Sequence, residues 1–261
     1  MRTRRHEGAP RFWGAFFVSL ALLALLAGGC QARGALDARV QRVIDGDTVL
    51  LTDGRRVRLI GLDTPELPHD GRPGEPLATE ARDALKALLT PHRFRVRLEY
   101  DRQRKDPHGR TLAHLYTPDG TNLTEALLNR GLASLVVIPP NVRHVDRYAA
   151  AERRARRARK GVWRLPRFQP VTVSELGQRA GGFHVVRGRV THVGHGRKSV
   201  WLDFGRRFAA RVAREDLPWF EGLDLDGLKG RRIEVRGLVW PGRKTDLQMR
   251  LRHPALLAIL E

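Results

Sequence analysis

The sequence predicts a mainly β protein that also contains helices, an α+β fold. We expect a small closed barrel of five strands with three helices beside it, followed by a second, smaller β-barrel. Before residue 165 the segments follow one another as three strands, a helix, two strands and two helices. After residue 171 the chain starts again with short β-type runs, in the order three strands, a short helix and two strands. These two orders, and the strand-like alternation within the runs, predict the fold class.

Length and charge set the first limits on function. The 261 residues allow one large or two small domains, and 41% hydrophobic residues exclude a disordered chain. Lys and Arg number 48 against 28 Asp and Glu, so the formal net charge is +20. A charge of this size indicates an anionic partner. We favour nucleic acid, with an anionic membrane surface as the alternative.

Residues 1–30 have the pattern of an export signal. An apolar run over 12–27 is shorter than the ~20 apolar residues of a membrane span, and it ends in small residues. This pattern predicts a secretory signal peptide and not mature structure. The positive charges that precede the run are Arg2, Arg4, Arg5 and Arg11.

Cys30 is the only cysteine, so no intramolecular disulfide can form. Its position after small residues resembles the lipobox of bacterial lipoproteins, in which this cysteine becomes the acylated N-terminus. The match departs from the usual pattern at Ala27, where a leucine is expected. We favour lipidation of Cys30 and a lipid anchor in the membrane, with the protein exported to the cell envelope. Gln31 in place of Asp does not favour inner-membrane retention, so we expect the outer-membrane or periplasmic side. Ordinary cleavage with secretion, or an uncleaved anchor, are the alternatives.

The first barrel, within 38–165, begins with a hairpin. Asp53-Gly54 lies between the strand-like runs 48–52 and 55–60, and an Asp-Gly pair in this position is a strong hairpin signal. Alternating apolar residues then predict strands at 93–100 and 110–116, separated by a polar loop. The helices are predicted from the helical spacing of apolar residues, from a proline in a first turn and from Gly131 as a stop signal. They are expected at 77–88, 121–130 and 142–160.

The second barrel is expected within 171–261. Its aromatic residues could stack nucleic-acid bases, but we favour core packing for them. The order of its strands is typical of an oligonucleotide-binding (OB) fold, so this part is a candidate nucleic-acid-binding domain. The predicted strands are 183–193, 199–204, 208–212, 231–240 and 247–251, with a short helix at 214–222. The aromatic residues are Trp201, Phe204, Phe208 and Trp240.

Four carboxylates surround one arginine in the stretch 43–66. The hairpin folds the chain back, so Asp47 at the start of one strand and Asp63 beyond the end of the other can lie close together. Two carboxylates and a backbone carbonyl suit a hard cation such as Ca²⁺, and the guanidinium of Arg58 suits a phosphate. Asp45 and Glu66 complete the group. The same residues also form ordinary turn sequences, but their combination around a strand arginine favours phosphodiester hydrolysis.

This stretch resembles the staphylococcal nuclease (thermonuclease) family, whose fold is an OB-type barrel. The similarity extends from about Ala38 to Trp163. The matching segments are Ile44-Asp45-Gly46-Asp47-Thr48, then Arg58 five residues before Asp63, then Asp63-Thr64-Pro65-Glu66, and finally Gly109-Arg110.

The resemblance implies a Ca²⁺ site made by Asp47, Asp63 and the carbonyl oxygen of Thr64, with Asp45 helping through bound water. Mg²⁺ or Mn²⁺ would fit such a set less comfortably.

The resemblance also implies that Glu66 is the general base, while Arg58 and Arg110 hold the phosphoryl oxygens. For Arg110 alone, a surface ion pair with the preceding loop is the simpler interpretation. Many family members have tyrosines that stack on the nucleotide base. Here no aromatic residue follows Gly131-Leu132-Ala133 closely, and His108 stands at another tyrosine position, which makes base stacking doubtful.

The sequence therefore predicts an exported, Ca²⁺-dependent nuclease, which we expect to be a monomer. Its expected substrate is DNA, with RNA as a further candidate, and little sequence specificity. The alternative is an envelope-tethered nucleic-acid-binding protein without catalysis. The run 153–160, with five Arg and one Lys, fits either a solvated helix face or neutralisation of phosphates.

Overall fold

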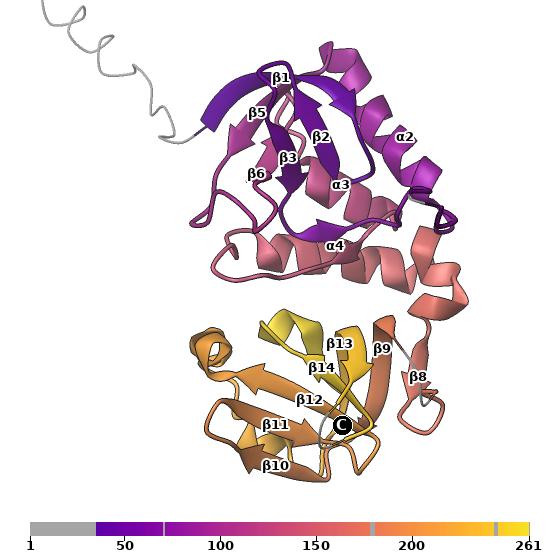
Figure 1. The fold of residues 1–261 in the computed structure, drawn as a ribbon, viewed down its shortest axis with the longest axis vertical. Coiled ribbons are helices and arrows are strands. Elements are labelled where there is room, and N and C mark those ends of the chain that lie inside the picture. The colour runs from indigo at the N-terminus through magenta and orange to yellow at the C-terminus, as the bar shows by residue number, and fades with distance from the viewer. Residues whose placement is uncertain (1–34, 70, 178–180, 243–244, 261) are drawn as a thin grey trace, which may run out of the picture. The chain divides into compact units, whose positions relative to one another are not determined.

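A computed structural model describes residues 35–69, 71–177, 181–242 and 245–260 (Figure 1). The predicted signal peptide and Cys30 lie outside these residues. The described residues belong to one compact unit. None of the helices in this part of the chain is long and apolar enough to cross a membrane.

The first sheet is a closed barrel with the strand order β1-β2-β3-β6-β5. One long strand closes it, because β1 pairs with β5 through Ala35–Arg39 and with β2 through 40–43, with a register irregularity between Val40 and Arg42. All neighbours are antiparallel except β3 and β6. The strands are β1 (Ala35–Val43), β2 (Thr48–Leu51), β3 (Arg56–Leu59), β5 (Arg95–Glu99) and β6 (Thr111–Tyr116).

The predicted hairpin is present between β2 and β3. Gly54 has φ 84°, a left-handed conformation that glycine adopts without steric cost. Strand alternation then places one set of side chains inside the barrel, where Val49, Leu51, Val57 and Leu59 are buried. The opposite face of β3 carries Arg56 and Arg58, which are less buried.

Three α-helices accompany the barrel, as predicted: α2 (Ala78–Leu89), α3 (Leu123–Arg130) and α4 (Val145–Arg157). Asn122 caps α3 by accepting a hydrogen bond from the N–H of Glu125, and Gly131 ends this helix at φ 69°. The prediction for α4 was too long at both ends. The chain leaves the helix by a 3-10 turn, and Gly161 packs so closely on Gly131 that a side chain at either position would collide with the other segment.

The second sheet has eight strands, in the hydrogen-bonded order β10-β11-β12-β14-β13-β9-β8, with β15 also paired to β13. From β10 to β9 the strands repeat the pairing of the first barrel, since β12 and β14 are parallel and the other neighbours are antiparallel, while β8 adds a second parallel pair with β9. The strands are β8 (Pro170–Thr172), β9 (Gly182–Arg189), β10 (His192–His195), β11 (Ser199–Asp203), β12 (Phe208–Ala213), β13 (Arg232–Pro241), β14 (Leu247–Arg250) and β15 (Leu257–Ile259).

Two predictions for this part were wrong in detail. The expected strand 183–193 is divided into β9 and β10, because the first half pairs with β13 and the second half with β11. The expected helix 214–222 is a 3-10 segment, η4 (Arg214–Phe220), in which Pro218 cannot donate a helical hydrogen bond. The other 3-10 segments are η1 (Thr90–His92), η2 (Gly161–Arg164), η3 (Pro166–Phe168), η5 (Asp226–Leu228) and η6 (Pro254–Leu256).

The aromatic residues of the second sheet divide into two groups. Phe204 and Phe208 are buried and pack on each other with ring centroids 5.3 Å apart, as the core interpretation predicted. Trp201 and Trp240 are only half-buried.

Helix α4 and strand β13 are joined by buried ion pairs. Glu152 on α4 lies 2.6 Å from Arg236 on β13, and both side chains are at most 7% exposed. Arg156 on α4 pairs with Glu234 at 2.8 Å, and Glu234 also accepts a hydrogen bond from Arg187 at 2.9 Å. These contacts attach the second sheet to a helix that packs beside the first barrel.

Candidate active site

The loop between β1 and β2 holds the first two carboxylates. Asp45 accepts a hydrogen bond from the N–H of Asp47 at 2.9 Å, so it caps the turn. Gly46 lies tightly against Ala81 of α2 and against Thr64, because a Cβ at this position would come within 2.8 Å of both. Only glycine fits between these neighbours, and the loop is thereby pressed against the segment that carries the other carboxylates.

Asp47 is the most enclosed carboxylate of the site, with 1% of its surface exposed. Its Oδ2 accepts hydrogen bonds from the N–H of Thr64 at 3.1 Å and from the Thr64 hydroxyl at 3.0 Å. Its Oδ1 accepts from the hydroxyl of Thr48 at 3.0 Å and forms an ion pair with Arg58. Burial raises the pKa of Asp47 to about 6, and the charge of Asp45 adds to this effect while Arg58 opposes it.

Arg58 lies between the two predicted metal ligands. One terminal nitrogen contacts Asp47, and the other donates to Asp63 at 2.7 Å and to the carbonyl oxygen of Leu62 at 3.3 Å. Burial raises the pKa of Asp63, the charge of Asp47 adds to the rise, and Arg58 opposes it. The sequence-based prediction that the hairpin brings Asp47 and Asp63 together around Arg58 is confirmed by these contacts.

A two-stranded pair that the sequence did not reveal positions Asp63. Strand β4 (Leu62–Asp63) pairs with β7 (Ser134–Leu135), with Leu62 opposite Leu135 and Asp63 opposite Ser134. Glu152 accepts a hydrogen bond from the N–H of Leu135 at 2.7 Å. Helix α4 therefore supports the strand on which a candidate ligand lies.

Glu66 is exposed at the rim of this group. Partial burial raises its pKa, and the charges of Asp47 and Asp63 raise it further. Its backbone is fixed by Glu75, whose side chain accepts from the N–H of Glu66 at 3.2 Å and whose N–H donates to the Glu66 carbonyl at 2.8 Å. Glu75 in turn pairs with Arg167. Neither partner was predicted, and no local pattern indicates them.

Arg110 reaches the site from the loop before β6. Its Nε donates to Asp106 at 2.6 Å and its N–H to the same carboxylate at 2.9 Å. Asp106-Pro107-His108-Gly109 has the residues of a tight turn, a signal that could have indicated this pairing. The simple interpretation of Arg110 as half of an ion pair is thus correct for Nε. Among the described contacts its terminal nitrogens have no protein partner.

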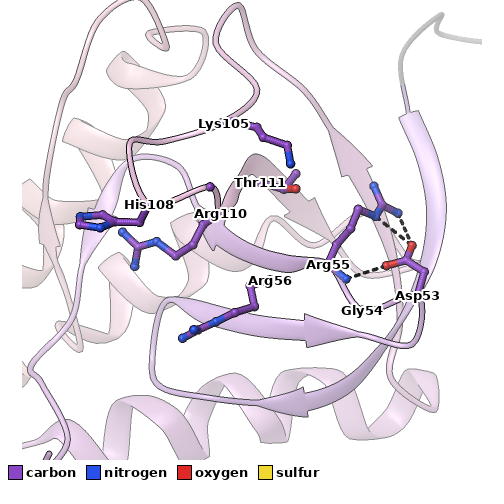
Figure 2. A pocket seen from close by; sticks show the side chains of 9 residues that line it. Asp53, Gly54, Arg55, Arg56, Lys105, His108, Arg110 and Thr111 are labelled. Carbon is purple, nitrogen blue, oxygen red and sulfur yellow. Dashed lines mark hydrogen bonds and ion pairs between the residues drawn. The ribbon is translucent and has the colours of Figure 1, made fainter. Parts of the chain in front are cut away.

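Arg58 and Arg110 line one cavity of about 290 Å³, although no described contact joins Arg110 to the carboxylates. His108 and Ile138 also line it, at places where base-stacking aromatics were considered, and Ile138 is 53% exposed. A larger cavity of about 740 Å³ shares Arg110 and His108 with the first. In Figure 2, Arg56 on β3 and Arg110 at the end of the loop before β6 extend in the same direction along this second cavity.

The oxygen atoms of Asp47, Asp63 and Thr64 are the candidate ligands for a cation. No group of three or more His, Cys, Asp or Glu side chains that could hold a metal occurs in the described part of the chain. Among the predicted direct ligands only Asp47 and Asp63 are such side chains, with the Thr64 carbonyl as the third donor, while Asp45 is predicted to act through bound water. Burial raises the pKa of both carboxylates, the charge of Asp45 adds to the rise at Asp47 and that of Asp47 to the rise at Asp63, and both share a single arginine. Oxygen donors with this excess of negative charge fit a hard divalent cation.

Comparisons with known proteins identify the family of this chain. The family model described as "Staphylococcal nuclease homologue" matches residues 56–165. The chain is 40% identical to the thermonuclease of Staphylococcus hyicus over 129 residues, which are 48% of this chain and 74% of that protein. It is 36% identical to the thermonuclease of Staphylococcus intermedius over 163 residues, 58% of this chain and 95% of that protein. Endonuclease YncB of Bacillus subtilis is 32% identical over 133 residues, covering 49% of this chain and 62% of that protein. The chain belongs to the staphylococcal nuclease family.

Proposed function

We propose that this nuclease uses Ca²⁺ to hydrolyse phosphodiester bonds of DNA, and of RNA as well, with little sequence specificity. The observation that carries the proposal is the contact of Arg58 with both Asp47 and Asp63, next to the exposed carboxylate of Glu66. Binding of nucleic acid alone would need cations, whereas the group also holds a carboxylate placed to act as a base.

Asp47, Asp63 and the Thr64 carbonyl would hold the Ca²⁺ ion, with Asp45 helping through bound water. When bound, the ion would supply positive charge that neutralises the two carboxylates and stabilises negative charge on the phosphate.

The chain's own residues supply the remaining chemistry. Glu66 takes a proton from a water molecule, whose oxygen attacks phosphorus while the bond from phosphorus to the leaving ester oxygen breaks. The leaving oxygen then receives a proton from solvent. Arg58 and Arg110 hold the phosphoryl oxygens from the walls of their common cavity, because a planar guanidinium matches two oxygens of a phosphate. The raised pKa of Glu66 makes its carboxylate a stronger base than an ordinary exposed glutamate.

Sequence tolerance follows from the walls of the cavity. Ile138, Val136 and His108 line the space beside the two arginines, so no tyrosine is present there to clamp a base. Recognition then depends on the phosphates, which are the same in every nucleotide.

The test is cleavage of plasmid and of single-stranded DNA and RNA in Ca²⁺ or in EDTA, by the wild-type protein and by Glu66→Gln. We expect cleavage that requires Ca²⁺ and falls at least a hundredfold in the variant, while oligonucleotide binding in EDTA is retained. Binding by the wild-type protein without cleavage in Ca²⁺, Mg²⁺ or Mn²⁺ would refute the proposal and would favour a non-catalytic nucleic-acid-binding protein. Glu80→Gln, on the exposed face of α2, is the matched control.

We also propose that the protein is exported and anchored in the cell envelope by lipid on Cys30, and that it acts as a monomer. Export and the lipid anchor are supported by the sequence of residues 1–30 alone, with its arginines, apolar run and single cysteine. Mass spectrometry of the mature N-terminus from the membrane fraction should show an acylated Cys30, and Cys30→Ser should release the protein from that fraction. An unmodified N-terminus on soluble protein would refute the anchor.

A further inference from the structure

The charged side chains that border the larger cavity beside the active site are mainly cations. It has a volume of about 740 Å³ and lies between the β2–β3 turn and the loop before β6 (Figure 2). Its charged side chains are Arg55, Arg56, Lys105 and Arg110 against a single carboxylate, Asp53. None of the residues with a proposed part in the reaction lines it except Arg110.

The one carboxylate in the wall is already neutralised. Arg55 donates to Asp53 through Nε at 2.9 Å and through a terminal nitrogen at 2.6 Å, and its backbone N–H donates at 3.0 Å. The other terminal nitrogen of Arg55 donates to the hydroxyl of Tyr100 at 2.7 Å. Arg55 is therefore held in place as a partner for Asp53, and its charge does not add to the attraction for an anion.

Arg56 and Lys105 differ from Arg55 in having no carboxylate partner among the described contacts. Both are exposed, and neither has an ion pair among the described contacts. Their charges are not cancelled by a neighbouring carboxylate, and nothing in the fold requires them at these positions. A solvated surface would explain one such side chain, but it does not explain two of them facing a cavity that continues to Arg110.

Strand geometry aligns Arg56 with the catalytic cavity. Arg56 and Arg58 are two residues apart on β3, and side chains at this spacing lie on the same face of a strand, about 6.6 Å apart along it. The parallel neighbour β6 places Thr111 opposite Val57 and Leu112 opposite Arg58, so the chain just before β6, at Arg110, comes beside Arg56. Cations thus follow one another from Arg58 past Arg110 and Arg56 toward Lys105.

We propose that Arg56 and Lys105 bind the backbone phosphates that adjoin the scissile one, so that the larger cavity is the path of the nucleic-acid strand away from the reacting phosphate. The proposal rests on the proposed function and extends it to the preferred substrate, which is a polynucleotide and not a short fragment. Phosphate contacts of this kind position a strand without reading its sequence.

The test compares Arg56→Ala/Lys105→Ala with Arg39→Ala/Arg95→Ala in the full chain. The control pair removes the same charge from exposed, paired positions on β1 and β5 of the same barrel. Binding of a fluorescein-labelled dT12 is measured by anisotropy in EDTA, with Glu66→Gln present in every variant so that nothing is cleaved. We expect affinity to fall roughly tenfold in the first pair, and the slope of log K against log salt to weaken by about 1.4, from ~0.7 per lost phosphate contact on a single strand.

A second measurement separates the strand path from damage to the active site. With Glu66 intact and Ca²⁺ present, the Arg56/Lys105 pair should raise KM for dT12 several-fold and leave kcat/KM for a chromogenic bis-aryl phosphodiester unchanged. An equal loss of kcat/KM on both substrates would overturn the proposal. An equal loss of dT12 affinity in the control pair would overturn it as well. Loss of binding to phosphatidylglycerol vesicles with dT12 binding unchanged would assign the cations to a membrane surface instead. A wild-type protein that binds dT12 but cleaves nothing would refute the proposed function. The comparison of dT12 binding between the two pairs of variants would then still test the strand path.

Discussion

The ion pair between Glu152 and Arg236 should make the second sheet necessary for a stable active site. Glu152 is completely buried, and its described partners are the N–H of Leu135 and the guanidinium of Arg236. Arg236 is 6% exposed and donates its only other described hydrogen bond to the carbonyl of Ala255 at 3.0 Å. The contact of 2.6 Å is electrostatic and not a well-aligned hydrogen bond, since Glu152 Oε2 has no hydrogen-bond partner in the described structure.

Substitution Arg236→Met should therefore leave a carboxylate buried without its counter-ion. Breaking a buried pair in this way costs about 3–5 kcal/mol. With a urea m-value of about 3 kcal/mol/M, expected near the upper end for a unit of this size, the midpoint should fall by about 1–1.7 M. Arg156→Met is the matched control, because Glu234 keeps its second partner Arg187 and the midpoint should fall by less than about 0.5 M.

The double variant Glu152→Gln/Arg236→Met makes the test sharper. It removes both charges, so its loss should be smaller than the sum of the two single losses by at least about 1 kcal/mol. Because Glu152 supports Leu135, and β7 pairs with the strand that carries Asp63, Arg236→Met should also raise the half-saturating Ca²⁺ concentration for cleavage at a temperature where the variant is folded. Additive losses, or a midpoint shift no larger than that of the control, would refute this reasoning.

Three further predictions concern the site itself. In metal-free protein Asp47→Asn should raise the free energy of unfolding at pH 7.5 by roughly 1–3 kcal/mol. The reason is the raised pKa of Asp47, about 6, which means that the ionised carboxylate is disfavoured in the folded state. For the same reason the stability of the wild-type protein should increase as the pH falls through 6, and cleavage should decline below that pH. Urea titrations from pH 5 to 8 check the sign, and a destabilised variant would contradict it. His108→Tyr should add a stacking surface to the wall of the cavity and strengthen binding of a single nucleotide at least fivefold, as measured by calorimetry beside His195→Tyr, which lies in the second sheet. Gly46→Ala should lower stability by about 1–3 kcal/mol through overpacking against Ala81 and Thr64, whereas Gly177→Ala, with open space around it, should be neutral.

Local signals explain why much of the barrel and the centre of the site could be predicted. The Asp53-Gly54 turn and the alternation on both sides of it determine the register of β2 and β3, and that register brings the ends carrying Asp47 and Asp63 together. Gly131 ends α3 as expected because a glycine can take the left-handed φ at a helix end. In each case the residue type has a preference that acts within a few positions of the chain.

The missed features depend on partners that are distant in the sequence. Strands β4 and β7 have two residues each, which is too short for any periodicity to be recognised, and they pair across about seventy positions. Glu152 stands among arginines on α4 and looks like an exposed residue, but its burial is determined by Arg236, which belongs to the other sheet. The division of the expected strand 183–193 likewise follows from its two different neighbours, β13 and β11.

The site combines stable backbone positions with unfavourable charges. Asp47 is held through its own carbonyl, which accepts from the N–H of Leu59 at 2.8 Å, and through its N–H, which donates to Asp45. Its side chain is nevertheless placed where burial opposes ionisation, and Asp63 repels it. Arg58 alone cannot balance both carboxylates and Glu66, so the folded protein keeps an excess of negative charge within a strongly positive chain. A fold selected for stability alone would remove that excess by an Asp-to-Asn change, which needs no movement of the backbone. Under the proposed function a bound cation would balance this excess, and the predicted stabilisation by Asp47→Asn would then also measure how much stability the fold gives up for the site.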